Sequence, residues 1–140
     1  MKQAGIMLII KDGLILGISR RHNKEIFGLP GGSFDEKLGD KDIIDTAIRE
    51  VREETSIFVK TPVFIYKRQE LGDCNKQILF ESYCYYAMEW EGNPNSSEEG
   101  EVKWLTVEEI TSTKAAFGDY NRQMLNSFKK KFPEVQLQGE

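Results

Sequence analysis

Apolar residues first occur in short runs separated by polar turn residues, a pattern typical of β-strands. Two such runs, residues 6–10 and 14–19, flank Asp12 and Gly13, and an Asp-Gly pair in this position predicts a β-hairpin. The segment 71–73 is predicted to be a turn. Further strands are predicted at residues 26–29, 63–68, 77–90 and 102–105, with a Pro-Gly-Gly turn at residues 30–32 ending the first of them.

The apolar spacing changes to a helical period after residue 41. Ile44, Ala47, Ile48 and Val51 follow the i, i+3, i+4, i+7 pattern, which predicts a helix over residues 42–55 with one core-facing stripe. The N-cap candidates are Asp40 and Asp42, because an acidic side chain suits the positive end of a helix.

Two more helices are predicted towards the end of the chain. Thr106 and Glu109 have the spacing of a capping box, which predicts a short helix. Residues 119–132 are predicted to form a closing helix that Pro133 ends, and the tail from about residue 133 is expected to be flexible. With 140 residues, the chain is expected to form a single domain, 1–140, of the α/β class.

Composition narrows the classes of partner. The formal net charge of −4 argues against a DNA-binding surface and disfavours long RNA, but it allows a small anionic substrate if a bound metal reverses the local charge. The apolar run at residues 6–10 is too short for a signal peptide or a membrane span, so no membrane partner is expected. Two cysteines, Cys74 and Cys84, are too few for a disulfide framework, and Cys84 is expected to be a buried thiol. We therefore expect a cytoplasmic protein.

Three carboxylates occupy little more than one turn of the predicted helix. Glu50 and Glu54 stack at i,i+4 with Glu53 beside them, and like charges at that spacing cost an exposed helix about 0.2–0.5 kcal/mol per pair. A hard divalent cation, Mg²⁺ or Mn²⁺, suits such a set of oxygen ligands. The alternative is an acidic helix face that simply faces water.

The residues around this helix resemble a known signature. Gly31 and Gly32, a loop, and the segment 47–55 (Ala-Ile-Arg-Glu-Val-Arg-Glu-Glu-Thr) are similar to the Nudix box of the Nudix hydrolases. Residues 10–20, 27–32 and 101–110 are similar to the opening hairpin, the Leu-Pro-Gly-Gly segment and the late strand and helix of that family. The resemblance covers most of residues 4–112 and implies a Nudix-type α/β/α sandwich with a mixed β-sheet.

The chain departs from the family pattern at two places. Ser56 stands where the box has a glycine, and a serine in the left-handed conformation costs about 1 kcal/mol. The distance from Gly32 to Arg49 is three residues longer than in the family, so the first glutamate of the box has no direct equivalent. The nearby acidic candidates for its role are Asp35, Glu36 and Asp40.

The resemblance implies a metal-dependent hydrolase that cleaves the pyrophosphate linkage of a nucleoside diphosphate derivative. The implied metal ligands are the carbonyl of Gly32 and the side chains of Glu50, Glu53 and Glu54; Glu50 and Glu53 are also catalytic candidates, with Arg49 holding Glu53 in place. The alternative is a non-catalytic Nudix-fold module that binds a nucleotide or regulates, which the lengthened loop motivates.

Other parts of the site are less sharply indicated. Glu98 and Glu99 precede the predicted strand 102–105 and are candidates for the general base, or belong to an ordinary acidic loop. Arg20 is a candidate for binding substrate phosphates, and Phe34 for stacking on a base. The aromatic residues of the segment 83–90 are consistent with either a homodimer contact or burial in the core. The sequence does not indicate which nucleotide derivative is the substrate.

Overall fold

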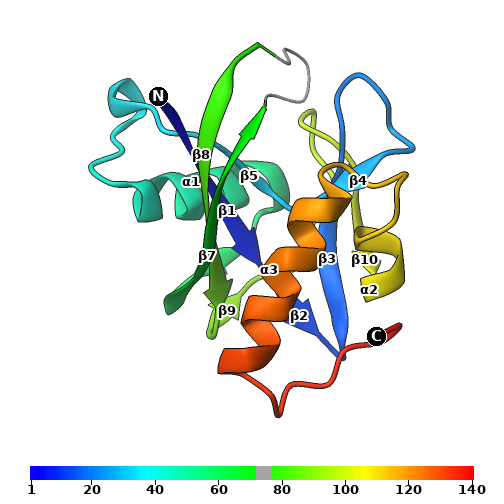
Figure 1. Ribbon diagram of the computed structural model, residues 1–140. Helices are drawn as coiled ribbons and strands as arrows, with labels where there is room; N and C mark the ends of the chain where they lie inside the picture. Colours follow the sequence, from blue (N-terminus) through cyan, green and yellow to red (C-terminus); the bar gives the residue numbers. More distant parts are fainter. Residues whose placement is uncertain (72–76) are drawn as a thin grey trace.

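The structure of the protein, a computed structural model, describes residues 1–71 and 77–140 (Figure 1). Of its two four-stranded sheets, the one with the longer strands, called the larger sheet below, is mixed. Its strand order is β5-β1-β8-β7. Strand β1 (Lys2–Leu8) pairs in parallel with β8 (Leu79–Ala87) and antiparallel with β5 (Gly31–Ser33), while β7 (Pro62–Leu71) pairs antiparallel with β8. The turn predicted at residues 71–73 lies, apart from Leu71, outside the described residues.

A second sheet contains the predicted hairpin. Asp12 and Gly13 have φ values of 54° and 78°, so the turn between the two strands needs two residues that tolerate a positive φ. The hairpin prediction is confirmed, because Ile10 pairs with Ile15 across it. The strands of this sheet are β2 (Ile10–Lys11), β3 (Leu14–Ser19), β4 (Phe27–Gly28) and β10 (Val102–Leu105), and a separate pair is formed by β6 (Phe58–Val59) and β9 (Trp90–Glu91).

The prediction that residues 30–32 form only a turn is wrong. Gly31 and Gly32 belong to β5, which pairs with β1. A Cβ atom on Gly31 would collide with the carbonyl oxygen of Gly5 and lie 2.9 Å from Ile6 Cα. Gly31 therefore allows β5 to lie against β1 at a distance that a side chain at this position would prevent.

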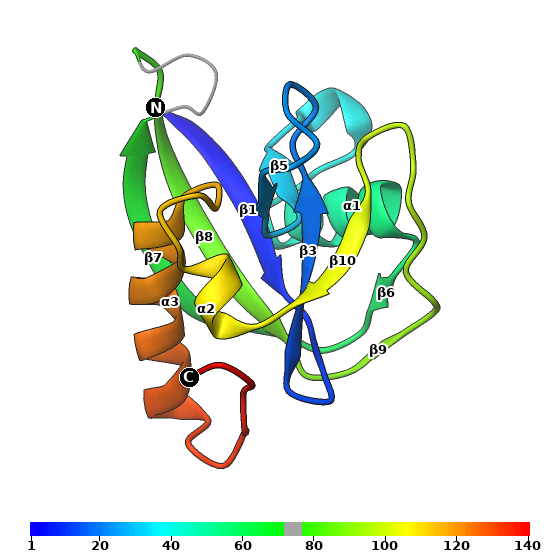
Figure 2. The same cartoon turned by 90° about the vertical axis from the view of Figure 1, so that its right-hand side faces the viewer.

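Helices cover both faces of the larger sheet (Figures 1 and 2). Because side chains alternate along a strand, Met7 of β1 packs with α1 (Ile43–Thr55) and its neighbour Leu8 packs with α3 (Gly118–Lys131). Two short helices, η1 (Glu36–Leu38) and α2 (Val107–Ile110), lie in connections. The arrangement confirms the predicted mixed-sheet α/β/α fold.

Local capping signals are observed as predicted. Asp42 is the N-cap of α1 and accepts a 3.0 Å hydrogen bond from the backbone N–H of Asp45. Thr106 and Glu109 form the predicted capping box at α2. Ser56 ends α1 in the left-handed conformation, with φ of 67°. The helix therefore keeps the backbone geometry of a glycine cap with a serine in that position.

The chain after α3 returns to the body of the domain. The backbone N–H of Gln138 donates to the carbonyl of Gly13 at 2.8 Å, and that of Val107 donates to Gln138 at 2.9 Å. Leu137 is buried. The sequence predicts a flexible tail from about residue 133, whereas in the structure these residues contact the hairpin and α2.

The aromatic residues of β8 and β9 contact partners within the chain. Tyr86 packs edge-on against Phe128, with ring centroids 4.8 Å apart, and Trp90 lies 6.1 Å from Trp104. Cys84 is a free thiol that is fully buried, as predicted. Among the described residues, no helix combines the length and the apolar character that crossing a membrane requires.

Candidate active site

The acidic side of α1 lies directly against β5. Helix and sheet approach closely because Gly5 has no side chain: a Cβ atom there would lie 2.8 Å from both the nitrogen of Ala47 and the carbonyl oxygen of Ile43. The carboxylate of Glu50 occupies the space where a side chain of Gly32 would be. Close packing of α1 on the sheet thus places its carboxylates beside the two glycines of β5.

Glu54 is the most strongly perturbed of these carboxylates. Its Oε1 accepts a 2.8 Å hydrogen bond from the backbone N–H of Gly31, which favours the ionised form. Burial outweighs this bond and, with the nearby charges of Glu50 and Glu99, raises the pKa of Glu54 to about 8. Burial also raises the pKa of Glu50. The site therefore gathers carboxyl groups whose ionised forms the neighbouring protein groups do not stabilise fully.

Arg49 connects this acidic cluster to the loop before the helix. Its Nη1 donates to Glu50 Oε1 at 3.1 Å and to Glu53 Oε2 at 3.3 Å, so the predicted contact between Arg49 and Glu53 is present. Its Nε and Nη2 bind the two oxygens of Asp40 at 2.9 and 2.8 Å. One guanidinium group thus orients Glu50 and Glu53 while its other edge is held by a buried carboxylate.

Asp40 is the one of the three acidic loop candidates that binds Arg49. Its side chain is only 2% exposed, and it also accepts hydrogen bonds from the Thr46 hydroxyl at 2.8 Å and the Asp35 backbone N–H at 2.9 Å. The hydrogen bonds from Arg49 hold the pKa of Asp40 far below its usual range.

The lengthened loop explains how Asp40 reaches this position. The carboxylate of Asp35 caps η1 by accepting from the backbone N–H of Lys37 at 2.9 Å. Gly39 then adopts φ of 96°, a conformation that reverses the chain and that a side chain would strain. The loop contains a single 3₁₀ turn, η1, and its left-handed end at Gly39 directs Asp40 towards Arg49.

The donor atoms of the acidic face suit a divalent metal. Carboxylate oxygens are the preferred ligands of Mg²⁺ and Mn²⁺, and a cation would stabilise the ionised form of Glu54, which burial and the nearby carboxylates disfavour. Within residues 1–71 and 77–140, however, no three His, Cys, Asp or Glu side chains converge closely enough to hold a metal. Glu50 and Glu53 are instead turned towards Arg49, and Glu54 towards Gly31.

The loop that carries Glu98 and Glu99 packs against the end of α1. The Ser97 hydroxyl donates to the carbonyl of Glu54 at 3.3 Å. Glu99 forms an ion pair with Arg21, and its charge is near enough to raise the pKa of both Glu50 and Glu54. Glu98 and Glu99 both line a pocket together with Arg20, Arg21 and Lys24. Of the two glutamates, Glu99 is therefore the one that interacts electrostatically with the helix carboxylates.

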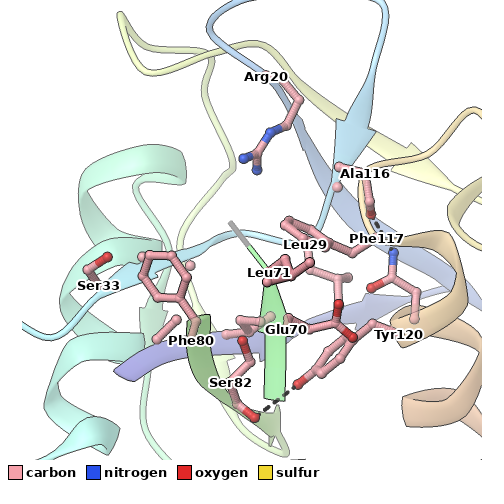
Figure 3. A pocket seen from close by; sticks show the side chains of 16 residues that line it. Arg20, Leu29, Ser33, Glu70, Leu71, Phe80, Ser82, Ala116, Phe117 and Tyr120 are labelled. Carbon is pink, nitrogen blue, oxygen red and sulfur yellow. Dashed lines mark hydrogen bonds between the residues drawn. The ribbon is translucent and has the colours of Figure 1, made fainter. Parts of the chain in front are cut away.

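A cleft of about 170 Å³ opens on the α3 side of the larger sheet (Figure 3). Gly31 and Gly32 line one end of it, so the cleft and the carboxylates of α1 meet at β5. Arg20 points its guanidinium group into the cleft in Figure 3, and that group lies 5.8 Å from the ring centroid of Phe117. Among the other residues that line the cleft are Leu29, Glu70, Phe80, Ser82, Tyr120 and Asn121.

Phe34 and Phe117 have different places relative to this cleft. Phe34 is not among the residues that line it, and its backbone N–H donates to the carbonyl of Gln3 at 2.9 Å. Phe117 lines the cleft with φ of 56°, a strained value for a bulky residue and one that clusters at functional sites. The sequence offered no signal that would bring Glu70 and Asn121 into the same site, since they are 51 positions apart and on different elements.

The fold and the site together define a small α/β domain that presents an acidic helix beside a glycine-lined cleft. The family model described as the NUDIX domain matches residues 1–128. The chain belongs to the Nudix family. Comparison with curated proteins gives no match.

Solved structures of other proteins share the fold. A MutT NUDIX hydrolase from Burkholderia pseudomallei is 21% identical, with a TM-score of 0.72 over 90% of this chain and 96% of that chain. The ORF135 protein of E. coli is 19% identical, with a TM-score of 0.73 over 96% and 92% of the two chains. The NUDIX domain of Shewanella oneidensis NrtR, complexed with ADP ribose, is 18% identical, with a TM-score of 0.71 over 94% and 86%.

Proposed function

We propose that the protein is a Mg²⁺- or Mn²⁺-dependent pyrophosphohydrolase that cleaves the pyrophosphate linkage of a small nucleoside diphosphate derivative in the cytoplasm. The observation that supports it most is the position of Glu54 and Glu50 where the cleft meets β5. Carboxylates that are costly to keep ionised without a cation, beside a cleft that contains an arginine, suit a metal-bound polyphosphate.

Each residue has a role in this proposal. The carbonyl of Gly32 and the carboxylates of Glu50, Glu53 and Glu54 would hold the metal, which would neutralise charge at the phosphates and acidify a bound water. Arg49 keeps Glu50 and Glu53 oriented, as its hydrogen bonds to both indicate.

The remaining roles concern the proton and the substrate. Glu99 is the preferred acceptor for the proton of the attacking water because its charge influences Glu54, and Glu98 remains a second candidate. Arg20 binds substrate phosphates near Glu54, where its charge lowers the pKa of that carboxyl. Phe34, predicted to stack on the base, keeps that role only if the base extends beyond the cleft.

The test is Glu54→Gln. The glutamine keeps an oxygen that can accept from the Gly31 N–H and removes a charge that burial disfavours, so the variant should be at least as stable as the wild type. Its turnover should fall by about a hundredfold or more, because losing a metal ligand removes several kcal/mol of charge stabilisation. Phosphate release from a panel of nucleoside triphosphates, dinucleoside polyphosphates, nucleotide sugars and ADP-ribose measures the turnover, and thermal unfolding the stability.

The matched control is Glu89→Gln, the same chemical change at an exposed position. It should leave both turnover and stability unchanged. Near-normal activity of Glu54→Gln with metal present would contradict the role of Glu54. Hydrolysis by the wild type that persists in EDTA would contradict the metal dependence.

A second candidate is a Nudix-fold module that binds a nucleotide without cleaving it. It is favoured by the engagement of Glu50 and Glu53 with Arg49, which leaves no metal-holding cluster in the described part of the chain. The S. oneidensis relative shows that the fold holds ADP-ribose in at least one protein. Tight nucleotide binding with no hydrolysis of any panel member, with or without Mg²⁺ and Mn²⁺, would favour this candidate over the enzyme.

A further inference from the structure

The segment 92–101, called the β9–β10 loop below, is attached to the domain at two places (Figure 2). At the end of α1, the backbone N–H of Asn95 donates to the carbonyl of Thr55 at 3.0 Å. At the end of β3, the hydroxyl of Ser19 accepts from the backbone N–H of Glu101 at 2.8 Å. The loop therefore connects the acidic helix to the strand that follows the hairpin turn.

Glu98 and Glu99 form the tip of this loop. Across them, the backbone N–H of Ser97 donates to the carbonyl of Gly100 at 2.9 Å, and that of Gly100 donates to the carbonyl of Ser97 at 3.2 Å. Gly100 lies close against β3, since a Cβ atom there would be 2.5 Å from the carbonyl oxygen of Ser19. The backbone on the β3 side of the two glutamates is therefore held in place.

The hydroxyl group of Ser97 holds the tip from the side of α1. It donates to the carbonyl oxygen of Glu54 at 3.3 Å and accepts from the backbone N–H of Glu99 at 3.1 Å. The carbonyl of Glu54 belongs to the last turn of α1, where carbonyl groups have no partner within the helix. One oxygen atom thus links the backbone of Glu54 to the backbone of Glu99.

The side chain of Glu99 is held less firmly than its backbone. Its carboxylate pairs with Arg21, whose side chain is 71% exposed, and an ion pair at such a position contributes little. The charge of Glu99 nevertheless raises the pKa of both Glu50 and Glu54, so this carboxylate acts on the acidic site. The contacts of Ser97 are therefore the main link that keeps Glu99 beside α1.

We infer that Ser97 is a positioning residue, whose hydroxyl group holds Glu99 at the distance from Glu54 that proton transfer requires. The inference rests on the proposed function, in which Glu99 accepts the proton of the attacking water. A general base must lie within hydrogen-bond reach of that water, and a misplacement of about 1 Å can lower the rate about a hundredfold. Because Ser97 acts through Glu99, its removal should affect turnover and leave substrate binding unchanged.

The test begins with two substitutions of Ser97. Steady-state assays with Mg²⁺ use whichever member of the nucleotide panel the wild type cleaves fastest. Ser97→Ala removes both hydrogen bonds of the hydroxyl and should lower kcat about tenfold, with KM within about twofold of the wild-type value. Ser97→Thr keeps the hydroxyl, and the exposed position has room for the added methyl group, so this variant should keep nearly the wild-type kcat.

A double variant shows whether Ser97 acts through Glu99. Glu99→Gln should lower kcat about a hundredfold, which is within the contribution of a positioned general base. Adding Ser97→Ala to Glu99→Gln should lower kcat no further, because the two residues serve the same step. Losses that multiply in the double variant, or a wild-type kcat in Ser97→Ala, would overturn the inference.

Ser96→Ala is the matched control. It makes the same change one position earlier, where the hydroxyl accepts from the backbone N–H of Val102 at 3.2 Å. Its kcat and KM should equal those of the wild type, whereas a loss as large as that of Ser97→Ala would show that general order of the loop is sufficient and would overturn the inference. Thermal unfolding of both alanine variants should stay near that of the wild type, because water can replace the hydrogen bonds of exposed serines.

The outcomes distinguish the inference from the proposed function. If Glu54→Gln lowers turnover as expected but Glu99→Gln and Ser97→Ala do not, the hydrolase activity stands and the inference is wrong. If the wild type hydrolyses no member of the panel, the proposed function and the inference both fail.

Discussion

The contact between Asp40 and Arg49 gives the sharpest stability prediction. Asp40→Asn keeps the size of the side chain but replaces one oxygen by an NH₂ group. Oδ2 of Asp40 accepts from Arg49, Thr46 and Asp35, whereas Oδ1 accepts only from Arg49 Nε. The asparagine should therefore keep its oxygen in the position of Asp40 Oδ2 and turn its NH₂ towards Arg49 Nε.

The cost follows from this geometry. One charge-assisted hydrogen bond is lost, worth about 1.5–3 kcal/mol, and the Arg49 side chain, 15% exposed, loses its buried counter-charge. Removing one partner of a buried ion pair typically costs about 3–5 kcal/mol. Because the isosteric change retains part of the network, we expect a loss of about 3 kcal/mol in the free energy of unfolding at pH 7.

The pH dependence has a defined sign. The pKa of Asp40 is lower in the folded protein than in the unfolded chain, where it is about 3.9. Its charge-linked stabilisation is complete above that value and is lost as the pH falls towards the folded pKa. At pH 3 the wild type should have lost about 1 kcal/mol of it, so the difference between wild type and variant should shrink to about 2 kcal/mol.

Urea unfolding at pH 7 and pH 3 measures both quantities, with Glu89→Gln as the carboxylate-to-amide control at an exposed site. A difference at pH 7 below about 1 kcal/mol would refute the reasoning from the buried network. A difference that stays constant or grows at pH 3 would refute the assignment of the charge effect to Asp40.

Two further predictions concern Gly32, which contacts Glu50 of α1, and Ser56, which ends that helix. Gly32→Ala should lower turnover about tenfold or more with little change in thermal stability, because the added Cβ would displace the carboxylate of Glu50. Steady-state assays measure the turnover, and a wild-type value for this variant would show that the position of Glu50 is unimportant. Ser56→Gly should raise the free energy of unfolding by about 0.5–1 kcal/mol, since φ of 67° is strained for serine and not for glycine. Urea unfolding checks the second prediction, and a less stable variant would show that Ser56 contributes more through contacts than it costs in strain.

The sequence by itself determined the features that depend on neighbours a few positions away. The hairpin at Asp12 and Gly13, the apolar stripe of α1 and the capping box at Thr106 each depend on residues that lie close together in the sequence. For the N-cap of α1 the sequence left Asp40 and Asp42 open, and the structure has Asp42. The resemblance to the Nudix box supplied the fold class, and the contact of Arg49 with Glu53 followed from i,i+4 spacing.

Only the tertiary structure decided which distant residues meet. In the structure, Gly31 and Gly32 form a strand rather than a turn. Asp40, of the three acidic candidates, binds Arg49. Glu70 on β7 and Asn121 on α3 line one cleft. No local pattern encodes these encounters, because they depend on the order of strands in the sheet and on how closely α1 can approach β1. The close approach of α1 to β1 is possible because Gly5 has no side chain. Its importance for the site can be recognised only when its neighbours in space are known.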